Sequence, residues 1–116
     1  MAKKQTLQKS VQYRVAKGIE FLNKEYGRSW LRRIDPERLA LESCSACMLG
    51  QLEGDYDEAV QRFALVQGKA AKLGFNVARD WKGYDDDYED ETMEFNELTV
   101  TWRDKIQKLR DRFGVV

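Results

Sequence analysis

The feature that most constrains this fold is a pair of long segments whose apolar residues recur every three or four positions. In the first segment, residues 6–26, one helical stripe is made by Leu7, Val11, Val15, Gly18, Ile19, Leu22 and Tyr26. In the second, residues 95–113, the stripe is made by Phe95, Leu98, Trp102, Ile106, Leu109 and Phe113. An isolated amphipathic helix is marginally stable in water, so each stripe must be buried against another element.

The stretch between these segments predicts several short helices and no strand. Asp55 is a suitable N-cap for a helix over residues 56–66, and Ser43 is a suitable N-cap for one over residues 43–53. No run alternates apolar and polar residues between turns, as a half-buried strand would. The sequence therefore predicts an all-α fold, a compact single-domain helical bundle over residues 1–116 with two long amphipathic helices framing several short central helices. We expect residues 1–5 to be flexible and residues 76–90 to form an acidic loop.

The charge of the chain is balanced overall but arranged in blocks. The 20 basic and 20 acidic residues give no net charge, yet residues 1–38 hold 10 basic and 4 acidic side chains, and residues 83–97 hold 8 acidic side chains and no basic one. Such blocks favour internal pairing of segments or a surface with two faces of opposite sign. A general nucleic-acid binder usually has an overall basic excess, which is missing here.

Nothing in the sequence indicates a membrane or a secretory route. No apolar run approaches the length that a bilayer span needs, and the lysine-rich start has no continuous apolar core after it. Two cysteines do not make a disulfide framework. We therefore expect a protein of the reducing cytoplasm with no membrane association.

The two cysteines, Cys44 and Cys47, have the C-x-x-C spacing that metal knuckles and redox pairs share. A structural zinc site normally takes four Cys or His ligands, and this chain has no histidine and no second cysteine pair. A redox pair usually lies in a βαβ context with a lowered thiolate pKa, and that context is missing. We therefore expect both thiols to be buried as small apolar groups in the helix over residues 43–53, where Gly50 allows close packing. A metal site and a redox pair stay open as alternatives.

The sequence offers little for catalysis. It has no histidine for general acid–base work, and it has no Gly-rich phosphate loop, nucleophile elbow or metalloprotease motif. Carboxylates are frequent, but none is distinguished by its pattern. We therefore expect that the protein is not an enzyme, and we predict no cofactor.

The acidic segment, residues 84–91, is the most unusual stretch of charge. Its alternating Asp85, Asp87 and Glu89 suggest calcium, but the glycine at the sixth position of an EF-hand loop is missing and Asn96 stands where the twelfth-position glutamate would be. Charge runs of this kind usually form a solvated loop. The alternatives are a surface for a basic partner and imitation of a nucleic-acid backbone.

A recurring pattern carries a family resemblance. The chain has C-x-x-C-x-L-G-Q-L from Cys44, then G-x-Y from Gly54, L-G-F from Leu73 and L-T-x-x-W from Leu98. In this order they resemble a group of small, uncharacterised proteins of actinobacterial phages and their hosts. The match covers about residues 35–110 and leaves out the acidic segment. The resemblance implies a bacteriophage accessory protein acting in the cytoplasm of a bacterial host, and it implies no residue roles.

Together these observations predict a non-enzymatic protein that binds and modulates a host or phage protein. We predict its contact surfaces on the polar face of the first helix and on the acidic segment, with the candidate residues Tyr13, Phe21, Tyr84, Asp85, Asp86, Asp87 and Tyr88. Two alternatives remain: a nucleic-acid-associated regulator that uses the basic N-terminal third, and a metal or redox module at Cys44 and Cys47. The sequence leaves the oligomeric state open.

Overall fold

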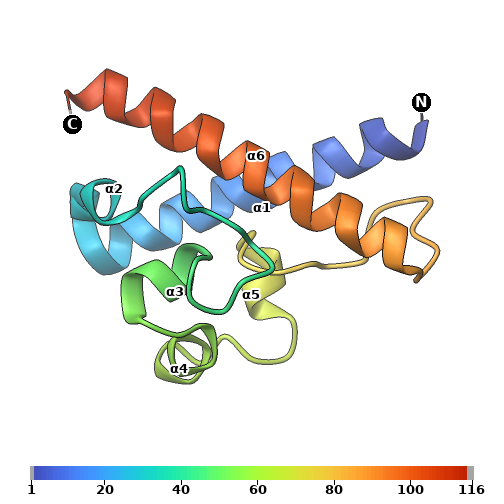
Figure 1. Ribbon diagram of the computed structural model, residues 1–116, viewed down its shortest axis with the longest axis horizontal. Helices are drawn as coiled ribbons and strands as arrows, with labels where there is room; N and C mark the ends of the chain where they lie inside the picture. The colour runs from blue at the N-terminus through green and yellow to red at the C-terminus, as the bar shows by residue number, and fades with distance from the viewer. Residues whose placement is uncertain (1, 115–116) are drawn as a thin grey trace.

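The fold is organised by two long helices, α1 (Ala2–Tyr26) and α6 (Tyr88–Phe113), in a computed structural model that describes residues 2–114. Contacts link Lys3 to Asp90 near their N-terminal ends, so the helices run in the same direction and cross (Figure 1). At the crossing lies Gly18, where a Cβ would stand 2.1 Å from the Leu73 carbonyl oxygen and 2.8 Å from the Trp102 ring. Only glycine permits this approach.

Short helices fill the rest of the structure: η1 (Gly27–Ser29), α2 (Trp30–Arg33), α3 (Met48–Glu53), α4 (Tyr56–Arg62) and α5 (Lys69–Lys72). Helices α3, α4 and α5 cover one side of the long pair (Figure 1). Residues 2–114 contain no strand. The predicted all-α bundle, with two long helices framing short central ones, is confirmed. In the same residues, no helix has both the length and the apolar character needed to cross a bilayer.

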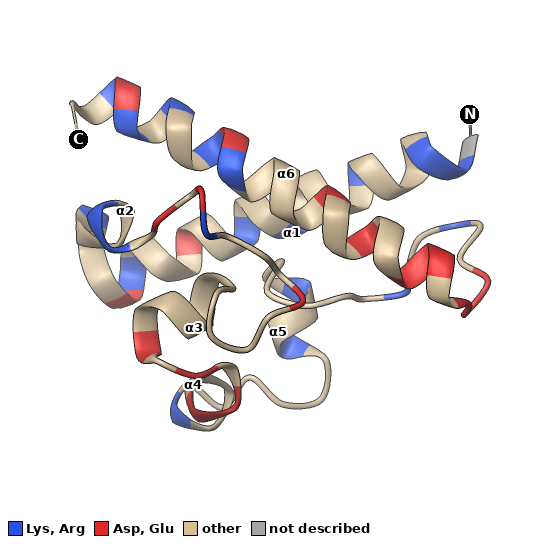
Figure 2. Ribbon diagram, in the orientation of Figure 1, with Lys and Arg blue, Asp and Glu red and all other residues tan. Residues whose placement is uncertain are grey.

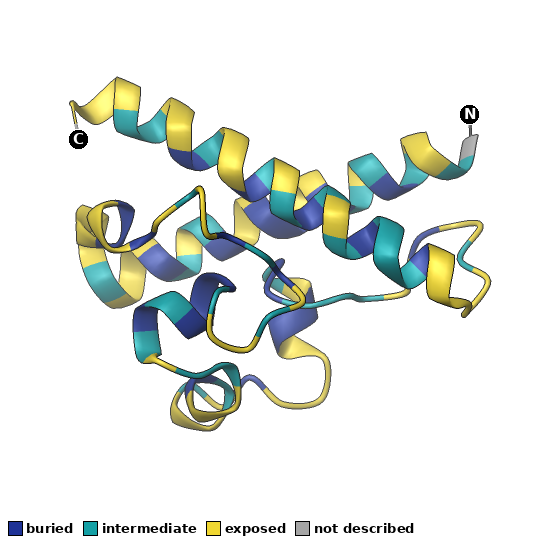
Figure 3. Ribbon diagram, viewed as in Figure 1, coloured by how far each residue is buried: buried dark blue, intermediate teal, exposed yellow. Residues whose placement is uncertain are grey.

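The core lies where the long helices meet each other and the short ones (Figure 3). Trp102 is fully buried; its ring stacks on Phe75 at 5.6 Å and meets Trp30 edge-on at 6.3 Å. Both predicted stripes are buried along most of their length. Phe113 is the exception, being 36% exposed, and its ring carries the Arg28 guanidinium at 3.9 Å.

The ends of the long helices differ from the prediction. Residues 2–5 are helical, although we expected residues 1–5 to be flexible; Met1 lies outside the described residues. Helix α6 starts at Tyr88, so the acidic loop ends at residue 87. Asp87 is the N-cap, its carboxylate accepting from the Asp90 N–H at 2.8 Å, and acidic residues in the first turn suit the helix dipole.

Candidate functional site

The two cysteines lie at a turn and a helix cap, and not within one helix. Helix α3 starts at Met48, and the Cys47 sulfur is its cap, accepting from the Gly50 N–H at 3.2 Å. The Ser43 hydroxyl accepts from the Ala46 N–H at 3.1 Å and so caps the turn that precedes α3. The predicted helix start at Ser43 is therefore wrong. The turn folds back onto α3, where a Cβ on Gly50 would stand 2.3 Å from the Cys44 carbonyl oxygen.

This geometry gives the two thiols different surroundings. Cys47 is buried, as expected, but Cys44 is exposed, so the prediction that both are buried is wrong for Cys44. Cys44 lines a hollow of about 250 Å³ together with Tyr56 and Asn76, whose amide donates to the Tyr56 hydroxyl at 3.0 Å. Within residues 2–114, no three His, Cys, Asp or Glu side chains gather as a metal site would require.

The difference in surroundings predicts a difference in thiol reactivity. Burial raises the pKa of the Cys47 thiol, so at neutral pH it holds less of the reactive thiolate and is also shielded. We expect iodoacetamide to alkylate Cys44 at least about tenfold faster than Cys47 in the folded protein, as measured by timed labelling and peptide mass spectrometry. In denaturant the two rates should become similar. Equal protection of both thiols in the folded state would contradict this arrangement and indicate a shared metal ion or a disulfide.

The acidic segment is anchored to α1 through Asp90. This carboxylate is 1% exposed, lies 2.6 Å from the Lys3 ammonium and accepts from the Asp85 N–H at 2.7 Å. The hydrogen bond from Lys3 holds the pKa of Asp90 below its ordinary value. On the other side, Arg79 pairs with Asp86 at 3.2 Å and with Glu91 at 3.1 Å. The backbone of the segment is therefore held in place from two directions.

Several side chains of the segment remain available to a partner. Tyr88 is 83% exposed, the largest exposure among the exposed large apolar side chains. Asp85 and Glu89 are exposed, and their carboxylates make no hydrogen bond or close ion pair within residues 2–114. The acidic segment therefore presents the exposed Tyr88 ring among carboxylates. Figure 2 shows acidic residues gathered in the loop before α6 and at the start of α6.

Of the other three aromatic candidates, Tyr84 and Phe21 are less available. Tyr84 is partly buried, with its ring edge-on to Trp81 at 5.3 Å, and its buried hydroxyl has no hydrogen-bond partner among the described residues. Phe21 is also partly buried, and its ring contacts Phe63 at 5.4 Å and Phe75 at 5.9 Å. Phe21 and Tyr13 therefore do not form one exposed patch on α1.

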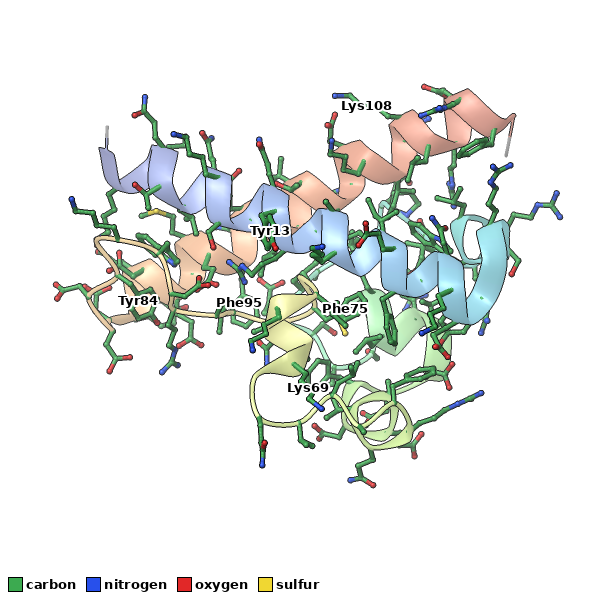
Figure 4. The ribbon with its side chains drawn as sticks, turned by 180° about the vertical axis from the view of Figure 1, so that it is seen from behind. Tyr13, Lys69, Phe75, Tyr84, Phe95 and Lys108 are labelled. Carbon is green, nitrogen blue, oxygen red and sulfur yellow. The ribbon has the colours of Figure 1, made fainter. Side chains whose placement is uncertain are left out.

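Tyr13 lies on an accessible face of α1. It is 66% exposed and borders a hollow of about 400 Å³ that Lys17, Lys72, Leu73 and Asp80 also line. The Lys17 ammonium stands 5.6 Å from the Tyr13 ring. Figure 4 shows Tyr13 midway along α1, on the side of the molecule that carries α5. Of the two residues predicted to form a contact surface on this helix, only Tyr13 is exposed.

Beneath the Tyr13 hollow lies a buried ion pair. The Arg14 guanidinium donates to the Glu94 carboxylate at 2.9 Å, and their side chains are 4% and 0% exposed. Arg14 also donates to the Asn76 carbonyl oxygen, and Glu94 also accepts from the Ala78 N–H and the Trp81 ring N–H. The pair therefore joins α1, α6 and the loop over residues 76–81. Its hydrogen bonds therefore hold the fold together around the pair.

The basic residues of the N-terminal third do not form one surface. Lys3 pairs with Asp90 and Arg14 is buried, while Arg33 donates to the Leu52 carbonyl oxygen. A helix of 25 residues is about 37 Å long, so Lys3, in the first turn of α1, is far from Arg28, which follows the other end of α1 in η1. A nucleic-acid surface built from this third alone stays a prediction that the geometry does not favour.

The comparisons with known proteins identify no relative. No protein-family model, no curated protein and no solved structure matches this chain. The resemblance to actinobacterial phage proteins therefore stays a prediction, and function is inferred from geometry and charge.

Proposed function

We propose that this protein is a non-enzymatic accessory protein that binds a basic surface of another protein through its acidic segment, with the Tyr13 face as a second contact. The single observation that carries the proposal is Tyr88, 83% exposed among carboxylates on an anchored turn. The phage origin and the bacterial cytoplasm that the resemblance implies belong to the same proposal.

The chemistry of the segment defines the kind of partner. Residues 84–91 hold six carboxylates and no basic side chain, so their field attracts a positively charged surface and speeds its approach. Tyrosine is enriched at the centres of protein interfaces because its ring buries a large area with few rotatable bonds. Since Lys3 and Arg79 already hold the turn, binding loses little conformational entropy.

The test removes charge while keeping the turn. In the variant D85N/D86N/D87S, the serine still offers an N-cap oxygen. The ion pair between Arg79 and Asp86 is lost, but Lys3 still pairs with Asp90 and Arg79 still pairs with Glu91, so the turn keeps an anchor on each side. We expect capture of partners from a bacterial lysate to fall at least about tenfold by quantitative mass spectrometry, because each lost charge contact at a desolvated interface costs about 1 kcal/mol or more.

A matched control separates this effect from a general loss of charge. The variant D57N/E58Q/D104N also removes three exposed carboxylates, from α4 and from the middle of α6, and should keep full capture. Both variants should melt as cooperatively as the wild type by circular dichroism. Unchanged partners with D85N/D86N/D87S would refute the proposed role of the acidic segment.

A further inference from the structure

A second surface of the molecule is a groove between α1 and the C-terminal half of α6. It has a volume of about 310 Å³ and is lined by Gln12, Ala16, Ile19, Lys105, Lys108, Leu109 and Arg112. We call it the basic groove. Ile19 and Leu109 are partly buried against the core, so the floor is apolar. The groove forms because the two long helices diverge beyond their crossing at Gly18 (Figure 1).

The rim of the basic groove is positively charged. Lys105, Lys108 and Arg112 line it, and among the described residues no acidic side chain does. Lys9 is exposed one turn before Gln12 and shares its face of α1. Asp104 pairs with Lys108 at 3.1 Å, but both side chains are exposed, so this pair is weak and open to exchange. An apolar floor inside a basic rim fits an apolar or aromatic side chain flanked by carboxylates.

The acidic segment presents that combination at the other end of the same helix. Tyr88 and Lys108 are 20 residues apart on α6, which at 1.5 Å per residue is about 30 Å. Figure 2 shows acidic residues at the start of α6 and basic residues toward its end. Figure 4 shows Tyr84 and Lys108 on opposite sides of the crossing of α1 and α6. A segment on a continuous helix cannot reach a groove beside that helix, so its complement within this sequence lies on another molecule.

We propose that the basic groove binds the acidic segment of a second copy of this chain, with the Tyr88 ring on the apolar floor and Asp85 and Glu89 facing Lys105, Lys108 and Arg112. This rests on the proposed function, because it names a basic partner surface for the acidic segment. The contact is heterologous: each molecule offers a different surface at each end. Repetition gives a ring where the rotation closes and an open filament where it does not.

The association is weak and depends on salt. One groove of this size buries less area than the roughly 1,200 Å² of a stable interface. The Debye length falls from about 10 Å at 0.1 M salt to about 3 Å at 1 M, so salt screens the charges between molecules. Within each molecule, the ion pair between Lys3 and Asp90 that holds the acidic segment includes a buried carboxylate, so salt screens it less.

Two variants test the two surfaces separately by sedimentation velocity of the full chain. The segment variant D85N/Y88A/E89Q removes the three side chains proposed to enter the groove and keeps Asp87 and Asp90. The groove variant K105Q/K108Q/R112Q removes the rim charges. In 0.1 M salt, the weight-average mass of the wild type should at least double between dilute and about 1 mM protein and should return to one chain in 1 M salt. Each variant alone should remain at one chain.

Mixing the two variants is the decisive measurement. The segment variant keeps an intact groove and the groove variant keeps an intact segment, so an equimolar mixture should form a one-to-one dimer and nothing larger. Matched controls alter exposed residues that lie outside both proposed surfaces and outside the Tyr13 hollow: D57N/E58Q/V66A for the segment and K24Q/R38Q/K69Q for the groove. Both controls should associate as the wild type does.

Three outcomes would overturn this assignment: a wild type that stays at one chain at every concentration, association that persists in both variants, or a mixture that gives no dimer. Retention of a monomeric wild type on heparin, lost only in the groove variant, would overturn it by assigning the groove to a polyanion. The proposed function fails separately, through unchanged partner capture by D85N/D86N/D87S. Capture that falls in that variant while the wild type stays monomeric refutes self-association and leaves the proposed function standing.

Discussion

Replacing Glu94 with alanine is expected to lower the free energy of unfolding by about 3 to 5 kcal/mol, the range measured when one member of a buried ion pair is removed. The change leaves the Arg14 guanidinium, 4% exposed, without its counter-charge. It also leaves the Ala78 N–H and the Trp81 ring N–H without their acceptor. Urea or guanidinium unfolding, followed by circular dichroism, measures the loss.

The double variant R14M/E94Q shows whether the uncompensated charge is the cause. With both charges removed, and an amide oxygen left to accept from Ala78 or Trp81, part of the lost stability should return. Glu91→Gln is the matched control, since Glu91 lies one turn earlier on α6 and pairs with Arg79 near the surface. It should change stability by less than about 1 kcal/mol. If the changes at Glu91 and Glu94 lowered the free energy of unfolding equally, the stability loss could not be attributed to the burial of the ion pair.

Replacing Gly18 with alanine is expected to destabilise the protein by about 3 kcal/mol, although helix propensity alone favours alanine by about 1 kcal/mol. The added Cβ would stand 2.1 Å from the Leu73 carbonyl oxygen and 2.8 Å from the Trp102 ring. A backbone oxygen cannot rotate away, so α1 must shift relative to α6 and α5. Because Trp102 donates its ring N–H to the Gly74 carbonyl oxygen at 2.7 Å, this shift also disturbs a buried hydrogen bond.

The change at Gly18 is measured by chemical unfolding and by near-ultraviolet circular dichroism, which reports the packing of the tryptophans. Gln5→Ala is the control, since residue 5 is exposed on α1 and gains only helix propensity. A G18A protein as stable as the wild type would contradict the close crossing of α1 and α6.

The long helices could be predicted because their periodicity is a local property of the sequence. Leu7, Val11 and Val15 are buried where the spacing places them. The start of α3 could not be predicted in the same way. Ser43 is a plausible N-cap on sequence grounds, but its hydroxyl caps a turn, and the α3 cap falls to the Cys47 sulfur. The close approach of Gly50 to Cys44 favours this choice, and it depends on tertiary packing.

The sequence contains a sign of the buried ion pair between Arg14 and Glu94, which is missed when only the apolar residues are considered. Arg14 falls between Val11 and Gly18 at spacings of three and four, and Glu94 precedes Leu98 by four. Both charged residues thus lie on the apolar stripes themselves. A charge on a buried stripe requires a partner, so the two positions could have been matched to each other. Their common contact with residues 76–81 could not be predicted, because that loop has no periodicity.

Among the candidate contact residues, some exposures could be predicted from the local sequence and others depend on tertiary packing. The exposure of Tyr13 and Tyr88 follows from their positions outside the apolar stripes. The partial burial of Phe21 does not, because its partners Phe63 and Phe75 come from distant parts of the chain. The basic groove was also out of reach of sequence reasoning. Lysines near the end of α6 are expected from the helix dipole, whether or not a groove is present. They line a groove only because α1 and α6 cross.

The parallel pairing of α1 with α6 also sets the order in which the protein forms during synthesis. Arg14 and Glu94 are 80 positions apart, so the apolar stripe of α1 has no long-helix partner until residues 88–113 have been made. Until then the nascent chain exposes that stripe to chaperones and proteases, and contacts of such separation slow folding. The frame of the acidic segment depends on Lys3 meeting Asp90, so the surface proposed to bind partners cannot form until residue 90 has been made. Chains that end before α6 would therefore lack both the proposed partner surface and the long-helix partner of the α1 stripe.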